Sequence, residues 1–512
     1  ISVDRLSLVL NSSLKVTHVY FSNGLELSPV VSPEYWLGNG GLTWESGADA
    51  WSVYHPEKIS SIQLDNRSGA CWMNADYTAD HPMLQWPLEK KARNYKVDRS
   101  FSEWRKDDTI EVSFSISLHE KNCEVPRLMP FPSGYEAAFL FTEHADFTSL
   151  RSQRVLATGD DTTFIHQASR GFVGWKIPVT KSVFYFNPDK VRNDEKGGFS
   201  PGEICNVNGT SGFAELLDSL QQLGWEVALH TPEQFTSNRE AVAMALDEMK
   251  KRFALETWID HGYDNGKSNN REDVVCDGLI KGNKNYIGDL LQNKGVKNIW
   301  NCYYEDSSFF GDVRFNDELI VPHPAFESAF PHPSMWNHNT LSGKATHFST
   351  TSTLDLIDGS MWNYFLGNER LDFLIAHHGD YFAHVYPSRI DSTNGFYSWR
   401  QNVWSINDEF DKVLQRLHQK SEEGKLWLPV VKEYTAYFNA LKLISYERVD
   451  DDRVMVTNRN AKEIKGLTFI LRSGGFQVEG KKVNSKKSGD DTLFWFDLLP
   501  GESCELKITS GR

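Results

Sequence analysis

The sequence predicts a multidomain α/β and all-β protein, with a distorted (β/α) barrel between an N-terminal and a C-terminal β-sandwich. Three observations lead to this fold class. The chain has 512 residues, which is too long for a single hydrophobic core. Its middle alternates short apolar strands with amphipathic helices. Both ends contain short alternating segments separated by turn residues, which are typical of β-sandwiches.

Residues 1–130 are expected to form the first β-sandwich. Its strands are predicted at 15–21, 59–64 and 109–118, where apolar and polar residues alternate. The Pro-rich stretch 126–134 predicts the link to the next domain.

Residues 135–445 are expected to form the barrel. Helices are predicted at 213–223, 238–253, 273–280 and 286–294, and strands at 225–229, 257–259 and 297–301. Ser237 is expected to cap the second helix, with Glu240 in the capping-box position. The repeated β-α order predicts a parallel sheet, and its length favours a barrel over an open sheet.

Residues 446–512 return to a β pattern and predict a small C-terminal sandwich. The expected strands are 453–457, 467–471, 492–496 and 504–508.

Composition narrows the classes of function. The net charge of −15 argues against nucleic acid as a partner, because phosphate binding needs a concentrated basic face. No run of 18 apolar residues is present, so no transmembrane segment is expected. The six cysteines are scattered without CxxC spacing, which excludes a zinc knuckle and disfavours a disulfide framework. Aromatic residues make up 13% of the chain, which is common where sugar faces are stacked.

Ionisable residues follow the predicted central strands. The apolar run 137–141 leads directly into Thr142, Glu143, His144 and Asp146. The later candidates are His230 after strand 225–229, Asp260 and His261 after 257–259, His377 and His378 after the apolar stretch 371–376, and His384 after 381–383. Because the carboxyl ends of parallel strands meet at one edge, we expect these side chains to lie close together. Such a set could hold a divalent metal with an activated water.

The order of these motifs resembles the polysaccharide deacetylase family, also called the nodulation-deacetylase homology or carbohydrate esterase family 4 domain. Residues 142–146 resemble its first motif, with Glu, His and Asp in place of two adjacent aspartates. His230 and Thr231 resemble the start of its second motif, but Gln234 replaces the final histidine. The resemblance covers roughly residues 135–445 and implies a distorted (β/α) barrel with a zinc-type ion.

The resemblance also implies roles. Glu143 would be the general base, Asp146 and His230 would bind the metal with help from His261, and His384 would be the general acid. His144, Asp260, His377 and His378 are alternatives for these roles. The implied reaction is metal-assisted removal of acetyl groups from a polysaccharide or oligosaccharide. That substrate class places the protein in the periplasm, outside the cell or on its surface, and the start at Ile1 suggests that a signal segment was removed.

Two other functions remain open on the residues alone. Glu143 and Asp260 could hydrolyse a glycosidic bond without metal. Alternatively, the metal site has decayed and the chain only binds carbohydrate.

Two further residues are candidates for substrate binding. Arg271 follows the His261 loop, where it could hold a substrate oxygen or belong to an ordinary helix cap. Trp336 ends a stretch rich in Pro, His and aromatic residues that could form a sugar-stacking lid or a rigid linker.

Overall fold

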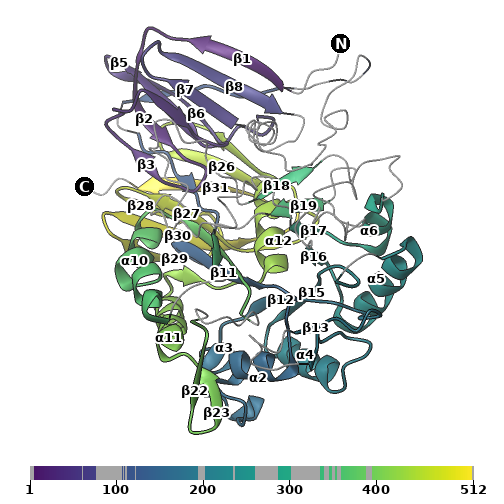
Figure 1. The fold of residues 1–512 in the computed structure, drawn as a ribbon. Helices are drawn as coiled ribbons and strands as arrows, with labels where there is room; N and C mark the ends of the chain where they lie inside the picture. The colour runs from purple at the N-terminus through teal and green to yellow at the C-terminus, as the bar shows by residue number, and fades with distance from the viewer. Residues whose placement is uncertain are drawn as a thin grey trace.

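The computed structural model is shown in Figure 1. It describes residues 5–59, 61–76, 107, 109, 112–121, 123–193, 202–234, 237–259, 286–300, 335–338, 345–348, 352–354, 359–387 and 395–509. Among these residues, no helix combines the length and the apolar character that a bilayer-spanning segment needs.

The N-terminal part consists of two antiparallel sheets that enclose a core containing Val19, Leu42 and Ile62. One sheet has the order β1 (Arg5–Asn11), β8 (Ala70–Asp76), β7 (Ser61–Asp65) and β4 (Glu34–Trp36). The other has the order β3 (Glu26–Leu27), β2 (Lys15–Tyr20), β5 (Gly41–Ser46), β6 (Asp49–Tyr54) and β9 (Ser117–Glu120). The strand predicted at 109–118 is wrong for most of its length, because Val112 and Phe114 pack against the core without joining a sheet.

A ten-stranded sheet forms the centre of the molecule. Its order is β18 (Met335–His338), β19 (Ala345–Phe348), β17 (Asn298–Trp300), β16 (Thr257–Ile259), β15 (Glu226–Leu229), β12 (Val179–Val183), β11 (Ala137–Glu143), β21 (Asp380–Val385) and β20 (Ser352–Leu354), with β24 (Leu426–Trp427) paired to β11. The pairs are parallel except for β18 with β19. Within the described residues β18 and β20 do not pair with each other, so this sheet is a half-barrel and not a closed barrel.

Helices cover one face of the central sheet. They include α2 (Leu150–Thr158), α3 (Gly171–Gly174), α4 (Phe213–Gln222), α5 (Arg239–Phe253), α6 (Gly288–Lys294), α9 (Trp362–Phe365), α10 (Asn368–Ala376) and α11 (Asp408–Glu422). The other face packs against α12 (Val431–Leu441) and the C-terminal strands, through residues such as Leu140, Tyr434 and Ile470.

Two local predictions in this part need correction. Asn238, not Ser237, caps α5, because its side chain accepts a hydrogen bond from the Ala241 amide. The apolar stretch 371–376 belongs to helix α10 and is not a strand. Its buried residues Leu371, Leu374 and Ile375 have the three- and four-residue spacing of a helical face.

The C-terminal part contains two antiparallel four-stranded sheets, in which the four expected strands are confirmed. The first has the order β10 (Arg127–Leu128), β27 (Ile464–Leu471), β30 (Asp491–Leu498) and β29 (Asn484–Ser488). The second has the order β25 (Ile444–Arg448), β26 (Arg453–Asn458), β31 (Ser503–Thr509) and β28 (Gly475–Val478). Strand β10 lies in the Pro-rich link, so this link is built into the C-terminal sheet; the domain boundaries stay a prediction.

Candidate functional site

Strand β11 determines which side chains reach the candidate site. All seven of its residues are buried, and successive side chains point to opposite faces of the sheet. Phe139 and Phe141 pack on the helix side, whereas Ala138 and Leu140 pack on the side of α12. By the same alternation, Thr142 points to the side of α12, and Glu143 points to the helix side.

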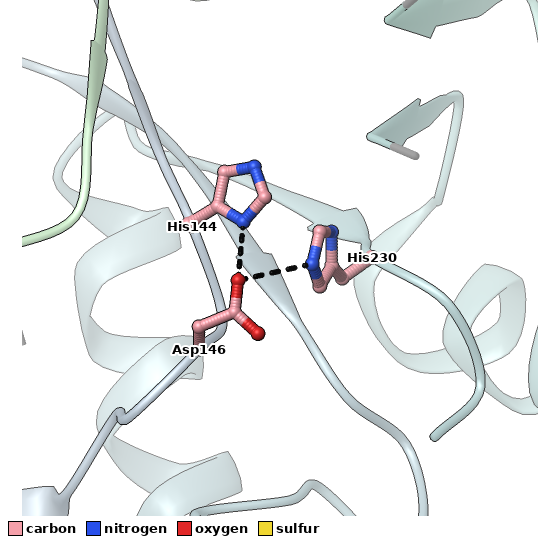
Figure 2. A group of neighbouring side chains, drawn as sticks. All are labelled: His144, Asp146 and His230. Carbon is pink, nitrogen blue, oxygen red and sulfur yellow. Dashed lines mark hydrogen bonds and ion pairs between the residues drawn. The ribbon is translucent and has the colours of Figure 1, made fainter. Parts of the chain in front are cut away.

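Three side chains meet just beyond the strand ends, as Figure 2 shows: His144, Asp146 and His230. His144 Nδ1 lies 2.7 Å from Asp146 Oδ2, and His230 Nε2 lies 3.6 Å from the same oxygen. One ligand atom from each residue lies within 4.8 Å of the others. Asp146 and His230 are therefore brought together as predicted, and His144 joins them.

The arrangement around these three residues suits a divalent ion. His230 Nδ1 donates to the Ile259 carbonyl oxygen at 2.7 Å, so that Nε2 is the nitrogen directed at Asp146. His144 uses Nδ1 towards Asp146, and its Nε2 lies 3.0 Å from the Tyr386 hydroxyl. Metal-binding histidines usually make such a hydrogen bond through the second ring nitrogen. Two imidazoles and one carboxylate are ligands that zinc accepts, and they leave a coordination position open.

Gln234 orients the carboxylate of this group. Its Nε2 donates to Asp146 Oδ1 at 3.4 Å, while Oδ2 faces the two imidazoles. The residue that replaces the expected second-motif histidine thus contacts a candidate ligand.

His384 lies beside the group but outside the set of mutually close ligand atoms. It pairs in register with Thr142 across β11 and β21, and a 2.7 Å hydrogen bond joins Thr142 Oγ1 to its Nδ1. Its ring centroid lies 4.2 Å from that of His144 and 4.8 Å from Trp300, on which it stacks. Its Nε2 is buried and has no hydrogen-bond partner among the described residues. Burial, with His144 and His230 nearby, holds the pKa of His384 well below its usual value.

Glu143 faces away from this group, and its carboxylate is already engaged. Lys181 on β12 lies 3.0 Å from Glu143 Oε1, and Gln153 on α2 donates to Oε2 at 3.2 Å. The pKa of Lys181 is lowered by burial, against the opposing effect of Glu143. The base role predicted for Glu143 does not fit this position, because the strand's alternation turns it towards the helices.

The other predicted site residues lie elsewhere. His377 and His378 precede β21, whereas His384 lies near the end of that strand. His377 and His378 therefore do not lie at the carboxyl edge of the sheet, where they were expected. Their Nδ1 atoms donate to the carbonyl oxygens of Phe373 and Glu136, respectively. Asp260, His261 and Arg271 lie outside the described residues, and Trp336 belongs to β18.

The sequence reasoning missed Tyr386 and Lys181. Tyr386 is half-buried and contacts His144, which is 242 positions away in the chain. Nothing local to its own segment indicates that contact. Lys181 gave no clear signal in the sequence, because β12 reads Val-Thr-Lys-Ser-Val and only the structure shows that all five residues are buried. A lysine buried in this way needs a buried partner.

No protein-family model matches this chain, and no curated protein matches it. Solved structures do match. An alpha-amylase from Geobacillus thermoleovorans complexed with acarbose is 10% identical, covering 74% of this chain and 99% of that chain with a TM-score of 0.27. A putative alpha amylase from Salmonella typhimurium is 9% identical, covering 100% and 98%, with a TM-score of 0.24. A pullulanase from Paenibacillus barengoltzii complexed with maltohexaose and alpha-cyclodextrin is 9% identical, covering 99% and 95%, with a TM-score of 0.28.

These matches correct the expected family. The structures named are alpha-amylases and a pullulanase, not polysaccharide deacetylases, so the predicted membership of the deacetylase family is wrong. TM-scores of 0.24–0.28 are too low for this likeness to carry an argument about fold or activity. The function has to be argued from the site itself.

Proposed function

We propose that this chain is a metal-dependent hydrolase acting on a carbohydrate, with His144, Asp146 and His230 holding a divalent ion, zinc by preference. The observation that carries the proposal is the convergence of two imidazole nitrogens on Asp146 Oδ2, each imidazole having its second nitrogen engaged elsewhere. Zinc bound there would polarise a substrate oxygen and lower the pKa of water.

The neighbouring residues would transfer a proton or contact the substrate. His384 Nε2, beside His144 and without a described partner, is placed to hold or move a proton during hydrolysis. Two aromatic rings surround these histidines: Tyr386 stacks on His144, and Trp300 stacks on His384. Trp300 is fully buried and excludes water from His384, whereas Tyr386 is partly exposed and could contact the apolar face of a sugar, which supports a carbohydrate substrate. The periplasmic or extracellular location stays a prediction tied to that substrate class.

Metal content tests the proposal most directly. We expect about one zinc per chain after incubation with the ion. Asp146→Asn and His230→Ala should lose it, and His166→Ala should keep it, because His166 is exposed and does not belong to the group of mutually close ligands. Hydrolysis of polysaccharides should stop on chelation and return with zinc. A wild-type chain that binds no ion would refute the proposal.

The second candidate is a glycoside hydrolase that uses two carboxylates and needs no metal. Glu143, one of the two carboxylates suggested for it, faces Lys181, and Asp260 lies outside the described residues. Release of reducing ends from maltotetraose or larger glucans that survives chelation would favour this candidate. Release that depends on zinc would favour the first.

A further inference from the structure

A polar cavity is lined by residues that do not belong to the candidate metal site. It has a volume of about 200 Å³ and lies where the N-terminal strands β2, β3, β5, β6 and β9 meet the segment 123–125 and Arg472 of the C-terminal part. In Figure 1, the purple strands β2, β3 and β6 lie next to the yellow-green C-terminal strands. The cavity is therefore built from both β-rich parts of the chain.

The carboxylates that line this cavity already have partners. Glu26 lies 3.4 Å from Arg127 and 3.8 Å from Arg472, and Glu45 lies 3.0 Å from Lys121. Glu124, the third carboxylate of the lining, accepts a hydrogen bond from the Ser473 amide. Arg472 is the cationic residue of the described lining, whereas Arg127 and Lys121 pair with Glu26 and Glu45 from outside it. Each lining carboxylate therefore already has a partner, which weakens its attraction for a further ion. A neutral ligand suits it better.

A chain of hydrogen bonds makes one wall rich in acceptors. His119 Nδ1 bonds the Glu120 carbonyl, which can only accept, so this nitrogen carries the proton. In the neutral ring, His119 Nε2 then accepts from Ser52. Ser52 in turn accepts from Thr43, and Thr43 accepts from the Tyr20 hydroxyl. Tyr20, Thr43 and His119 line the cavity, whereas Ser52 lies behind the lining. Because the hydroxyl protons are used within this chain of hydrogen bonds, the oxygens of Tyr20 and Thr43 keep lone pairs for a ligand.

Two further acceptors flank His18. Glu26 Oε1 lies 3.8 Å from His18 Nε2, and Glu45 Oε1 lies 3.9 Å from His18 Nδ1. Both distances exceed a hydrogen bond, and both carboxylates are nearly buried, at 12% and 13% exposed. Because Glu26 and Glu45 both line the cavity, donors from a ligand can still reach these oxygens.

We propose that this cavity is a second binding site, which takes one sugar unit of a neutral glycan. A pyranose ring matches the volume, and its several hydroxyl donors match the acceptor-rich wall and the two carboxylates. Arg472 supplies a donor for the ring or glycosidic oxygen. The choice of a sugar over another neutral polyol rests on the proposed carbohydrate function. The site would hold a glycan chain on the protein away from the point of hydrolysis.

Cys123 provides the test, because it is a free, half-buried thiol in the lining. Alkylation of the peptide that contains Cys123 would be followed by mass spectrometry while maltotetraose, cellotetraose or xylotetraose is titrated. A sugar at ten times its Kd should slow alkylation about tenfold, because only about one cavity in eleven is then empty. An unchanged alkylation rate with all three sugars would overturn the proposal.

Variants separate this site from the candidate active site. Glu45→Gln and Arg472→Ala should weaken the protection by raising the Kd about tenfold, as expected for loss of a charge-assisted hydrogen bond. Arg459→Ala, which removes an exposed ion pair with Glu57, should leave it unchanged. Asp146→Asn should also keep full protection. Protection that persists when zinc binding fails would support this site even if the proposed hydrolase function is wrong.

Discussion

The ammonium group of Lys181 lies 3.0 Å from Glu143 Oε1, and both side chains are almost completely buried. The same ammonium donates to the His144 carbonyl oxygen at 2.6 Å and to Thr148 Oγ1 at 2.9 Å. One cation therefore fixes three positions of the segment that carries His144 and Asp146. A buried ion pair of this kind positions the candidate ligands, although its charges cost desolvation energy.

Removing only one member of this pair should be costly. Lys181→Met leaves Glu143 buried without its cation, and we expect a loss of about 3–5 kcal/mol in the free energy of unfolding. The double variant Lys181→Met/Glu143→Gln should recover much of that loss, because no buried charge is then left unpaired. Urea unfolding of the wild type, both single variants and the double variant measures the coupling. Additive losses would show that the pair does not act as a unit.

Tyr386 should affect metal binding without being a ligand. With an ion at His144 Nδ1, Nε2 would carry the proton and donate it to the Tyr386 hydroxyl, 3.0 Å away. Tyr386→Phe removes that acceptor, so zinc affinity should fall by about 10- to 100-fold. Competition with a chromogenic zinc chelator measures the change. Tyr364→Phe, at an exposed tyrosine, is the matched control, and equal affinities in the two variants would contradict the assigned contact.

His384 should separate activity from metal content. It lies outside the three mutually close ligands, so His384→Gln should still bind zinc with the wild-type stoichiometry. Hydrolysis should fall by about 10²- to 10⁴-fold if its Nε2 transfers a proton. Zinc analysis and initial rates on the same preparation give both quantities. Loss of the ion together with the activity would instead identify His384 as a ligand.

The sequence located the site but not the direction of every side chain in it. The apolar run before Thr142 and the histidine after β15 correctly placed Asp146 and His230 near each other. Glu143 was misassigned because β11 is buried on both faces, and such a strand shows no apolar–polar alternation to indicate which face each residue occupies. The apolar stretch 371–376 before His377 is too short for its hydrophobic periodicity to distinguish a helix from a strand. The contact of His144 with Tyr386 depends on the pairing of β11 with β21 and has no local sequence signal.

His378 should make the stability of the fold depend on pH. The His378 side chain is buried, and its backbone has a positive φ of 51°. Its Nδ1 donates to the Glu136 carbonyl oxygen at 3.1 Å. Burial lowers the pKa of His378, and Arg127 lowers it further, whereas the charges of Glu136 and Asp491 oppose the shift. The folded-state pKa thus lies below the unfolded value of about 6.5.

The sign of the effect follows from proton uptake. Below pH of about 6.5 the unfolded chain binds a proton at His378 that the folded chain does not, so the stability is complete above this pH and falls as the pH drops. His378→Asn keeps a residue that tolerates positive φ and removes the titration. Its free energy of unfolding should therefore fall less steeply between pH 6.5 and the lower folded-state pKa, by up to about 1.4 kcal/mol per pH unit. Urea unfolding at a series of pH values from neutral to mildly acidic compares the two slopes. Parallel curves for the variant and the wild type would show that His378 takes up its proton equally in both states.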